Sequence, residues 1–479
     1  MVQTPTDTYL AAPVKSPPLW AVVLAACAGQ FLVVLDVSVV NTALPSMRAD
    51  LAMSAVGLQW VVNAYSIAFA GFMLLGGRAG DLFGRKRMFL VGLGLFTAAS
   101  LAGGLAQEGW QLLAARAVQG LGAAVLAPST LALLTSAVPE GPARVRAIGT
   151  WSAVGAGGGA AGGLVGGVLT DLLSWRWVLL INVPIGVLVL AAGVAWLSEG
   201  ATDRGRRLDL PGAVLVTAGL ATLAYGIVQT EIEGWTSTTT LVPLIAGLLL
   251  LGGFLLVEAR TRSPLMPLKL FRVRSVSAAN AAMFVCGGAM FSMWFFMTLY
   301  SQNVLGYSAM IAGLALIPSS LSVVVGSKVA PRLMPVVGAK NVSMIGIVVA
   351  AAGFGWQSTM TADGAYVTSI MLPGVLMMLG AGLASTPLAS LATSGAAPGD
   401  AGLVSGLINT SRTMGGALGL AVLSTVAASV SAGSDSGQAL TDGYAAAFRT
   451  SGIILVVGVV LMLLWMPGTR SDRATVRKD

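Results

Sequence analysis

The sequence has no histidine and very little charge. Charged residues make up 10% of its 479 residues, whereas soluble domains carry about a quarter, so this chain cannot cover a water-facing surface in the usual way. Without histidine, no imidazole can serve as a general base, metal ligand or pH switch. Cys27 and Cys286 both lie in apolar runs, which predicts small buried residues rather than a disulfide.

The sequence also lacks the motifs on which many enzymes depend. It contains no Walker A lysine motif, no cluster of metal ligands and no large segment outside its apolar runs. Such motifs supply the phosphate and metal chemistry of many enzyme classes. No cofactor and no metal site are therefore predicted, and a polytopic membrane enzyme, such as a lipid-modifying transferase, is disfavoured.

Long apolar segments dominate what is present. Hydrophobic residues make up 56% of the chain, and we count fourteen apolar segments between residues 19 and 466. A helix of about 20 residues crosses the ~30 Å hydrocarbon core of a bilayer. The predicted fold class is therefore all-α and polytopic, with the lipid bilayer as its surroundings. The 61 glycines indicate closely packed helices.

The basic residues predict the topology. With a cytoplasmic N-terminus, 22 basic residues fall in inner loops and tails, and three, Arg48, Arg176 and Arg449, fall in outer loops. This bias follows the positive-inside rule for an even number of spans, with both ends in the cytoplasm. The net charge of +8 then reflects topology, and no nucleic-acid partner is predicted.

Two similar loops indicate an internal repeat. GGRAGDLFGRKR (76–87) follows the second apolar segment, and GSKVAPRLMPVVGAK (326–340) follows the tenth. The loops occupy matching positions if the seventh and eighth segments are an insertion between two six-helix halves. The predicted parts are a tail (1–18), a first half (19–200), two inserted helices with linkers (201–275), a second half (276–466) and a tail (467–479). Paired halves favour alternating access around a site at the midplane.

Five stretches carry a resemblance to a known family. They are LDVSVVNTALP (35–45), GRAGDLFGRKR (77–87), RAVQGLGAA (116–124), the Gly-rich run into SWRWVLLINVPIG (174–186) and GLVSGLINTSRTMGGALG (402–419). In this order, and over nearly the whole chain, the sequence resembles the fourteen-span drug/proton antiporters of the major facilitator superfamily. The resemblance implies a monomeric transporter in a bacterial cell membrane that exports amphipathic drugs or antibiotics in exchange for protons.

Asp36 and Arg116 are the predicted proton-coupling residues. Asp36 lies about 26 Å from the inner end of its helix and Arg116 about 9 Å below the outer interface, so the two come to similar depth. An ionised Asp in hydrocarbon must pair with a cation, face a cavity or be protonated. We hypothesise that protonation of Asp36 weakens an Asp36–Arg116 pair. The alternatives are a purely structural pair and an Arg116 that snorkels to the outer interface.

Arg412 is a third charge within the membrane, near the midplane, with Asn409 on its helical face. Together with Asp36 and Arg116 it makes the intramembrane charge +1, which is awkward for a polycationic substrate and leaves neutral, zwitterionic or anionic ones open. The alternative is that backbone carbonyls of a neighbouring helix satisfy Arg412.

Polar, methionine and aromatic residues within the spans predict a substrate cavity. Met and aromatic side chains can form an adaptable pocket, although such residues are often lipid-facing or core instead. The candidates are Gln30, Asn41, Asn63, Tyr65, Met293, Trp294, Met297, Tyr300, Asn409 and Arg412.

The first repeated loop has a further role by resemblance. In the family it latches the two halves on the cytoplasmic side, which points to Gly77, Asp81, Gly84, Arg85 and Lys86. The alternative is that the basic residues only signal topology.

The glycine-rich fifth segment departs from the family pattern. Gly158, Gly162, Gly166 and Gly167 match the antiporter signature and predict a close-packing ridge, but Gly163 stands where the family has proline. This departure keeps proton-coupled uptake of a defined solute open. A lipid flippase is a further alternative, since a greasy cavity can accept lipid tails.

Overall fold

The computed structural model describes residues 18–139, 142–199, 208–261, 264–394, 401–432, 434 and 436–466. Every regular element in these ranges is a helix, and singly or joined end to end the helices form fourteen segments that are long and apolar enough to cross a membrane. The predicted all-α fold with fourteen spans is therefore confirmed.

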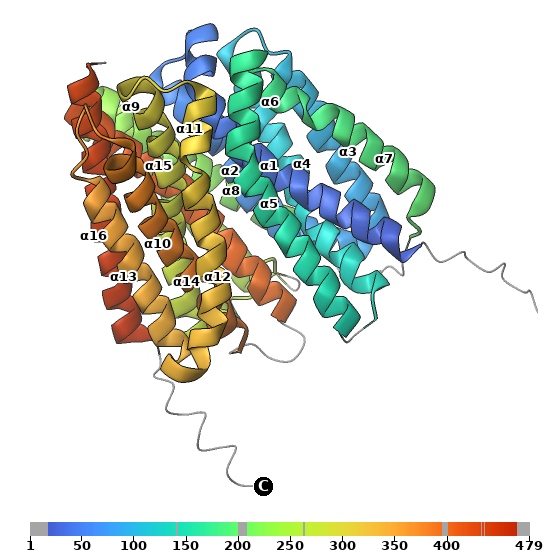
Figure 1. The fold of residues 1–479 in the computed structure, drawn as a ribbon. Helices are drawn as coiled ribbons and strands as arrows, with labels where there is room; N and C mark the ends of the chain where they lie inside the picture. The colour runs from blue at the N-terminus through green and yellow to red at the C-terminus, as the bar shows by residue number, and fades with distance from the viewer. Residues whose placement is uncertain are drawn as a thin grey trace, which may run out of the picture.

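The helices follow one another along the whole described chain (Figure 1). The first part comprises α1 (Leu19–Asp50), α2 (Ala55–Phe83), α3 (Arg85–Gly104), α4 (Gly109–Ala137), α5 (Pro142–Leu172), α6 (Trp177–Leu180) and α7 (Asn182–Trp196). Next come α8 (Leu210–Glu233), α9 (Thr238–Arg260) and the short η1 (Leu268–Arg272). The last part comprises α10 (Arg274–Leu299), η2 (Tyr300–Val304), α11 (Ala309–Ala315), α12 (Ile317–Val337), α13 (Ala339–Gln357), η3 (Val367–Met371), α14 (Leu372–Ser394), α15 (Ala401–Ser431) and α16 (Gly437–Trp465).

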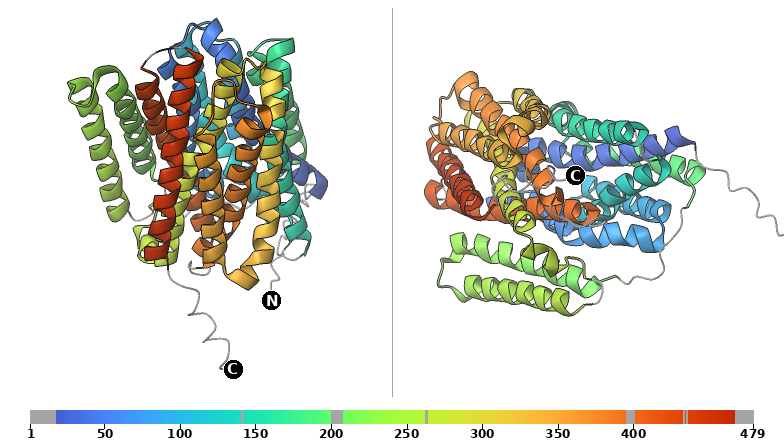
Figure 2. Two further views of the ribbon diagram at one scale, coloured as in Figure 1. Left: turned by 60° about the vertical axis from the view of Figure 1, so that its left-hand side comes forward. Right: turned by 90° about the horizontal axis from the view of Figure 1, so that it is seen from below.

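Two bundles pack with the same internal pairing. In the first bundle α2 and α3 both pack on α4, and α1 packs on α5; in the second, α12 and α13 both pack on α14, and α10 packs on α15. The helices α8 and α9 pack on each other, and α8 also contacts α2 and α15. Seen from below, α8 and α9 lie as a pair along one side of the two bundles (Figure 2). The matching pairs are the structural counterpart of the repeat in the sequence.

The two repeated loops have the same local geometry. Gly84 (φ +101°) and Gly338 (φ +87°) both adopt positive φ, a backbone region that glycine enters without strain. Two residues later, Lys86 Nζ donates to carbonyls at the end of α7, including Val194 O at 3.1 Å. Lys340 Nζ likewise donates to Met466 O at 2.6 Å, at the end of α16. Each lysine therefore ties its loop to the last helix of its own bundle, and basic side chains suit the negative end of a helix dipole.

Prolines interrupt two of the spans. Pro184 has no N–H to donate to the carbonyl four residues earlier, and the sixth span breaks at Ile181, between α6 and α7. Pro318 stands in the first turn of α12, just after the break from α11. The first break starts α7 at Asn182, whose side chain belongs to the site described next.

Candidate functional site

Asp36 on α1 and Arg116 on α4 form a buried ion pair. Arg116 Nη1 donates to Asp36 Oδ2 at 2.7 Å, and the two side chains are 2% (Arg116) and 0% (Asp36) exposed. The expected contact between these residues is thus present, and Arg116 does not snorkel to the interface. Breaking such a pair is costly, because removal of either charge leaves the other buried without compensation.

Neutral side chains complete the surroundings of the Asp36 carboxylate. Gln119 Nε2 donates to Asp36 Oδ1 at 2.7 Å and Asn182 Nδ2 donates to the same oxygen at 3.0 Å. Gln119 Nε2 also donates to Ser100 Oγ at 2.8 Å, and Gln119 Oε1 accepts from Arg116 Nη1 at 2.6 Å. The donors to Asp36 come from α4 and α7, so the charge of this one carboxylate holds α1 to both helices.

Tyr65 connects the ion pair to the space between the bundles. The Arg116 guanidinium carbon lies 4.3 Å from the centre of the Tyr65 ring, within cation–π range. Arg116 Nε also donates to Val61 O at 3.0 Å, one turn earlier on α2. Tyr65 stacks on Phe69 at 5.9 Å between ring centres, and both aromatic side chains line a large cavity. Tyr65 therefore contacts the Arg116 guanidinium and also forms part of the cavity wall.

The cavity lies between the two bundles and has a volume of about 1300 Å³. Most of its lining is apolar. The Met, Phe and Trp side chains in the lining are Phe69, Met73, Trp151, Met283, Met290, Phe291, Trp294 and Met378. The charged lining residues are Arg78 and Arg412, and no Asp or Glu occurs among the described residues of the lining. A cavity of this size exceeds the ordinary range for drug-sized ligands and suits a bulky amphipathic molecule.

Among the described residues, the cavity lining extends to one end of the bundles. Its lining includes Gly77, Thr135 and Pro264, which lie at the end that the topology assigns to the cytoplasm. At the opposite end the bundles touch. Asp171 of α5 accepts from the N–H groups of Ala309 and Met310 at 3.2 and 3.0 Å. With the predicted topology, this conformation is inward-facing.

Six of the ten predicted cavity residues line the cavity. They are Gln30, Asn41, Tyr65, Trp294, Asn409 and Arg412. The alternative proposed for Arg412 is not seen, since its side chain is exposed in the cavity and its described hydrogen bond goes to Asn409 Oδ1 at 3.0 Å.

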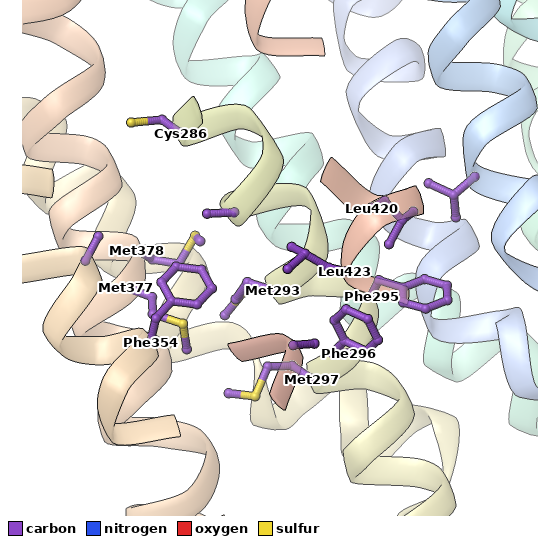
Figure 3. Close-up of a cluster of buried hydrophobic side chains, with 14 of the residues drawn as sticks. Cys286, Met293, Phe295, Phe296, Met297, Phe354, Met377, Met378, Leu420 and Leu423 are labelled. Atoms are coloured by element: carbon purple, nitrogen blue, oxygen red, sulfur yellow. The ribbon is translucent and has the colours of Figure 1, made fainter. Parts of the chain in front are cut away.

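The other four lie outside the cavity wall. Met293 and Met297 pack in the apolar core of the second bundle together with Phe354 and Met377 (Figure 3). Tyr300 is also buried in that core, and its hydroxyl donates to Thr361 O at 2.6 Å. Asn63 is fully buried on α2. The prediction that Met293 and Met297 line the cavity is wrong because protein covers α10 on most of its circumference. Only the face of α10 that carries Met290 and Trp294 meets the cavity.

Two residues of the site were not expected from the sequence. For Asn182 the sequence offers a signal, namely a polar residue two positions before the proline that interrupts an apolar span. Ser100 had none, because single serines are common in transmembrane helices and bond their own backbone, as Ser100 Oγ does with Phe96 O at 2.8 Å.

The described contacts of the loop expected to latch the two halves lie within its own bundle and with the segment that leads to η1. The N–H groups of Lys86 and Arg87 donate to the Glu199 carboxylate at 3.1 and 3.0 Å. A Cβ on Gly84 would overlap that carboxylate. Arg78, on the same stretch, donates to Pro264 O at 2.6 Å, in the segment that leads to η1. The side chain of Asp81 lies outside the described residues. The latch between the halves stays a prediction.

The predicted glycine ridge packs on two helices. Gly158, Gly162 and Gly166 face α1, where an added Cβ would meet atoms of residues 31–42. Gly163 and Gly167 face α11 of the other bundle. The position at which the family has proline is therefore a contact between the bundles.

Comparison with known proteins places these features in a family. The sequence model of the Major Facilitator Superfamily matches residues 26–420. A cephamycin export protein of Amycolatopsis lactamdurans is 49% identical over 91% of this chain and 90% of its own length. A puromycin resistance protein of Streptomyces alboniger is 38% identical over 97% of this chain and 93% of its own length.

Solved structures match in fold. A POT family peptide transporter in an auto-inhibited form superposes with a TM-score of 0.67 at 16% identity, over 93% of this chain and 96% of that one. A bacterial homologue of the human lysosomal transporter Spinster, in an inward-facing and unoccupied conformation, superposes with a TM-score of 0.64 at 15% identity, over 93% and 96% of the two chains. At these identities the likeness shows the fold alone.

Proposed function

This chain belongs to the Major Facilitator Superfamily, and we propose that it exports amphipathic antibiotics or related compounds from a bacterial cell in exchange for protons. It is an efflux transporter of the cell membrane rather than an enzyme. The relatives named for cephamycin and puromycin support an antibiotic-like substrate. We further propose that it works as a monomer with small molecules and protons as its ligands.

The observation that carries proton exchange is the buried Asp36–Arg116 pair behind the cavity wall. Protonation removes the charge of Asp36, so the 2.7 Å contact with Arg116 loses its ionic character. The contacts from Gln119 and Asn182 to Asp36 weaken as well, and α1 becomes freer to move against α4 and α7. Arg116 keeps its place over Tyr65 and changes the field at the cavity wall.

Exchange follows when proton and substrate favour opposite states of the carrier. The cytoplasm-facing cavity accepts substrate with Asp36 ionised, and an outward-facing form releases the substrate and takes up a proton at Asp36. Because linkage is reciprocal, substrate binding must then lower the proton affinity of the site to the same extent that the proton lowers substrate affinity. The bundles rock about the cavity as alternating access requires.

Reconstitution tests this proposal. Proteoliposomes with an imposed pH gradient and a panel of cationic, neutral and anionic dyes are compared for wild type, Asp36→Asn and Asp50→Asn. Asp50 is a matched control, because it lies on the same helix and pairs with Arg176 at 2.5 Å near the outer surface. We expect Asp36→Asn to abolish gradient-driven accumulation while equilibrium exchange of dye persists. Gradient-driven transport by Asp36→Asn would refute the role of Asp36.

The direction of transport separates the remaining candidates. Uptake of a solute predicts that expression raises cellular accumulation of the probe, whereas export predicts a decrease that disappears when the proton gradient is collapsed. Gly163, in place of the family proline, is the observation that favours uptake. A flippase predicts movement of labelled lipid between leaflets, measured in the same vesicles.

A further inference from the structure

Arg412 is a cation that faces the cavity, and no described residue is its acidic partner. Its side chain is exposed there, and Nη2 donates to Asn409 Oδ1 at 3.0 Å, one turn earlier on α15. A guanidinium has five N–H donors, so most of its donors are left for another group. The lining contains no Asp or Glu among its described residues, and Asp36 is already occupied by Arg116.

Close packing of α10 on α15 places apolar surface next to this cation. A Cβ on Gly287 of α10 would overlap the carbonyl of Arg412, so the helices meet at backbone distance. The Phe291 ring lies on Gly416, where an added Cβ would be 2.7 Å from the ring, and Gly416 is one turn after Arg412. Phe291 and Trp294 both line the cavity. A cation and an aromatic wall are thus adjacent on one side of the cavity.

We propose that Arg412 binds the carboxylate of an anionic amphipathic substrate, whose apolar body packs on Phe291 and Trp294. This inference rests on the proposed function and specifies its substrate class. A carboxylate matches the planar donors of a guanidinium and supplies the counter-charge that the lining lacks.

Binding in detergent tests the inference without a proton gradient. The probes are dansyl-phenylalanine, its methyl ester and its aminoethyl amide, which are anionic, neutral and cationic versions of one aromatic body. Energy transfer from Trp151 and Trp294, both in the lining, to the dansyl group reports occupancy. We expect wild type to bind the acid at least ~10-fold more tightly than the ester, as one charge-assisted pair implies, and the cationic amide most weakly.

Substitutions assign the preference to Arg412. Arg412→Gln should remove the difference in affinity between acid and ester by weakening the binding of the acid alone. Arg412→Lys should keep part of the difference, since the charge persists but the planar array of donors is lost. Arg449→Gln is the matched control, because Arg449 is an exposed residue of α16 outside the cavity lining. It should leave all three affinities unchanged. The elution profile of each variant in detergent shows that it is folded.

The outcomes are distinct from those of the transport test. Equal affinity of acid and ester in wild type, absence of acid binding, or equal weakening of both probes by Arg412→Gln would overturn the inference. Displacement of the bound acid by phosphatidylglycerol, but not by unlabelled N-acetyl-phenylalanine, would assign the cation to lipid instead and also overturn it. None of these binding results depends on proton coupling. Proton coupling is tested separately, by transport of Asp36→Asn in vesicles.

Discussion

Gly163 of α5 lies against the backbone of Gly313 of α11, on the side of the molecule where the two bundles touch. The contact is asymmetric. A Cβ on Gly163 would lie 3.5 Å from the Gly313 carbonyl oxygen, an ordinary separation, whereas a Cβ on Gly313 would overlap the Gly163 carbonyl. The inward-facing conformation therefore depends on the absence of a side chain at residue 313 more than at residue 163.

This asymmetry predicts different effects of two similar substitutions. Gly313→Val should separate the bundles at the outer end and favour the outward-facing form, and Gly163→Ala should be tolerated. The measurement is labelling of a cysteine introduced at Ala132, a lining residue, after both native cysteines are replaced by alanine. We expect labelling from the cytoplasmic side to fall several-fold in Gly313→Val alone. An equal effect of the two substitutions would contradict the packing described here.

The two acid–arginine pairs on α1 predict a large contrast in stability. Arg116→Gln leaves Asp36 buried without a counter-charge and should cost about 3–5 kcal/mol. Asp50→Asn breaks a pair whose members are 46% (Asp50) and 26% (Arg176) exposed, and should cost no more than about 1 kcal/mol. Thermal unfolding in detergent measures both, and the double variant Asp36→Asn/Arg116→Gln should recover part of the larger loss. Similar melting temperatures for the two single variants would be inconsistent with the burial of the inner pair.

The position of Tyr65 between Arg116 and the cavity predicts that substrate binding is coupled to proton release. Its hydroxyl is buried without a hydrogen-bond partner among the described residues, so Tyr65→Phe should keep both stability and transport. Tyr65→Leu removes the ring under Arg116 and a cation–π contact of about 0.5–2 kcal/mol. The readout is proton release on substrate addition in weakly buffered detergent solution. Release should be retained in Tyr65→Phe and reduced in Tyr65→Leu, and equal release from both would separate Tyr65 from coupling.

The matching lysine contacts of the two bundles predict that removal of either lysine lowers thermal stability by a similar amount. Lys86→Met and Lys340→Met each remove a cation from the carbonyl end of the last helix in its bundle, where such a charge contributes about 0.3–1 kcal/mol. We expect comparable, small decreases in melting temperature. Glu199→Gln should add to the loss in the first bundle only, because Glu199 accepts the N–H groups of Lys86 and Arg87. A loss confined to one lysine would show that the repeat is not energetically symmetric.

The amino-acid sequence alone determined the spans and their number, because ~20 apolar residues per crossing and the scarcity of charge leave few alternatives. It also singled out Asp36, Arg116 and Arg412, since a charge inside an apolar run is exceptional and the helical rise places it at a definite depth. The pairing of Asp36 with Arg116 followed from their similar depth.

Only the tertiary structure decided which neighbours surround these charges and which apolar residues meet the cavity. Ser100 and Asn182 reach the Asp36 site from α3 and α7, helices whose sequences place no unusual charge there. Met293 and Met297 lie in the core, while Met290 and Trp294 of the same helix line the cavity. The physical reason is that helical periodicity specifies which residues share a face but not what covers that face. Within a membrane protein, apolar side chains are equally suited to face lipid, the protein core or an apolar cavity.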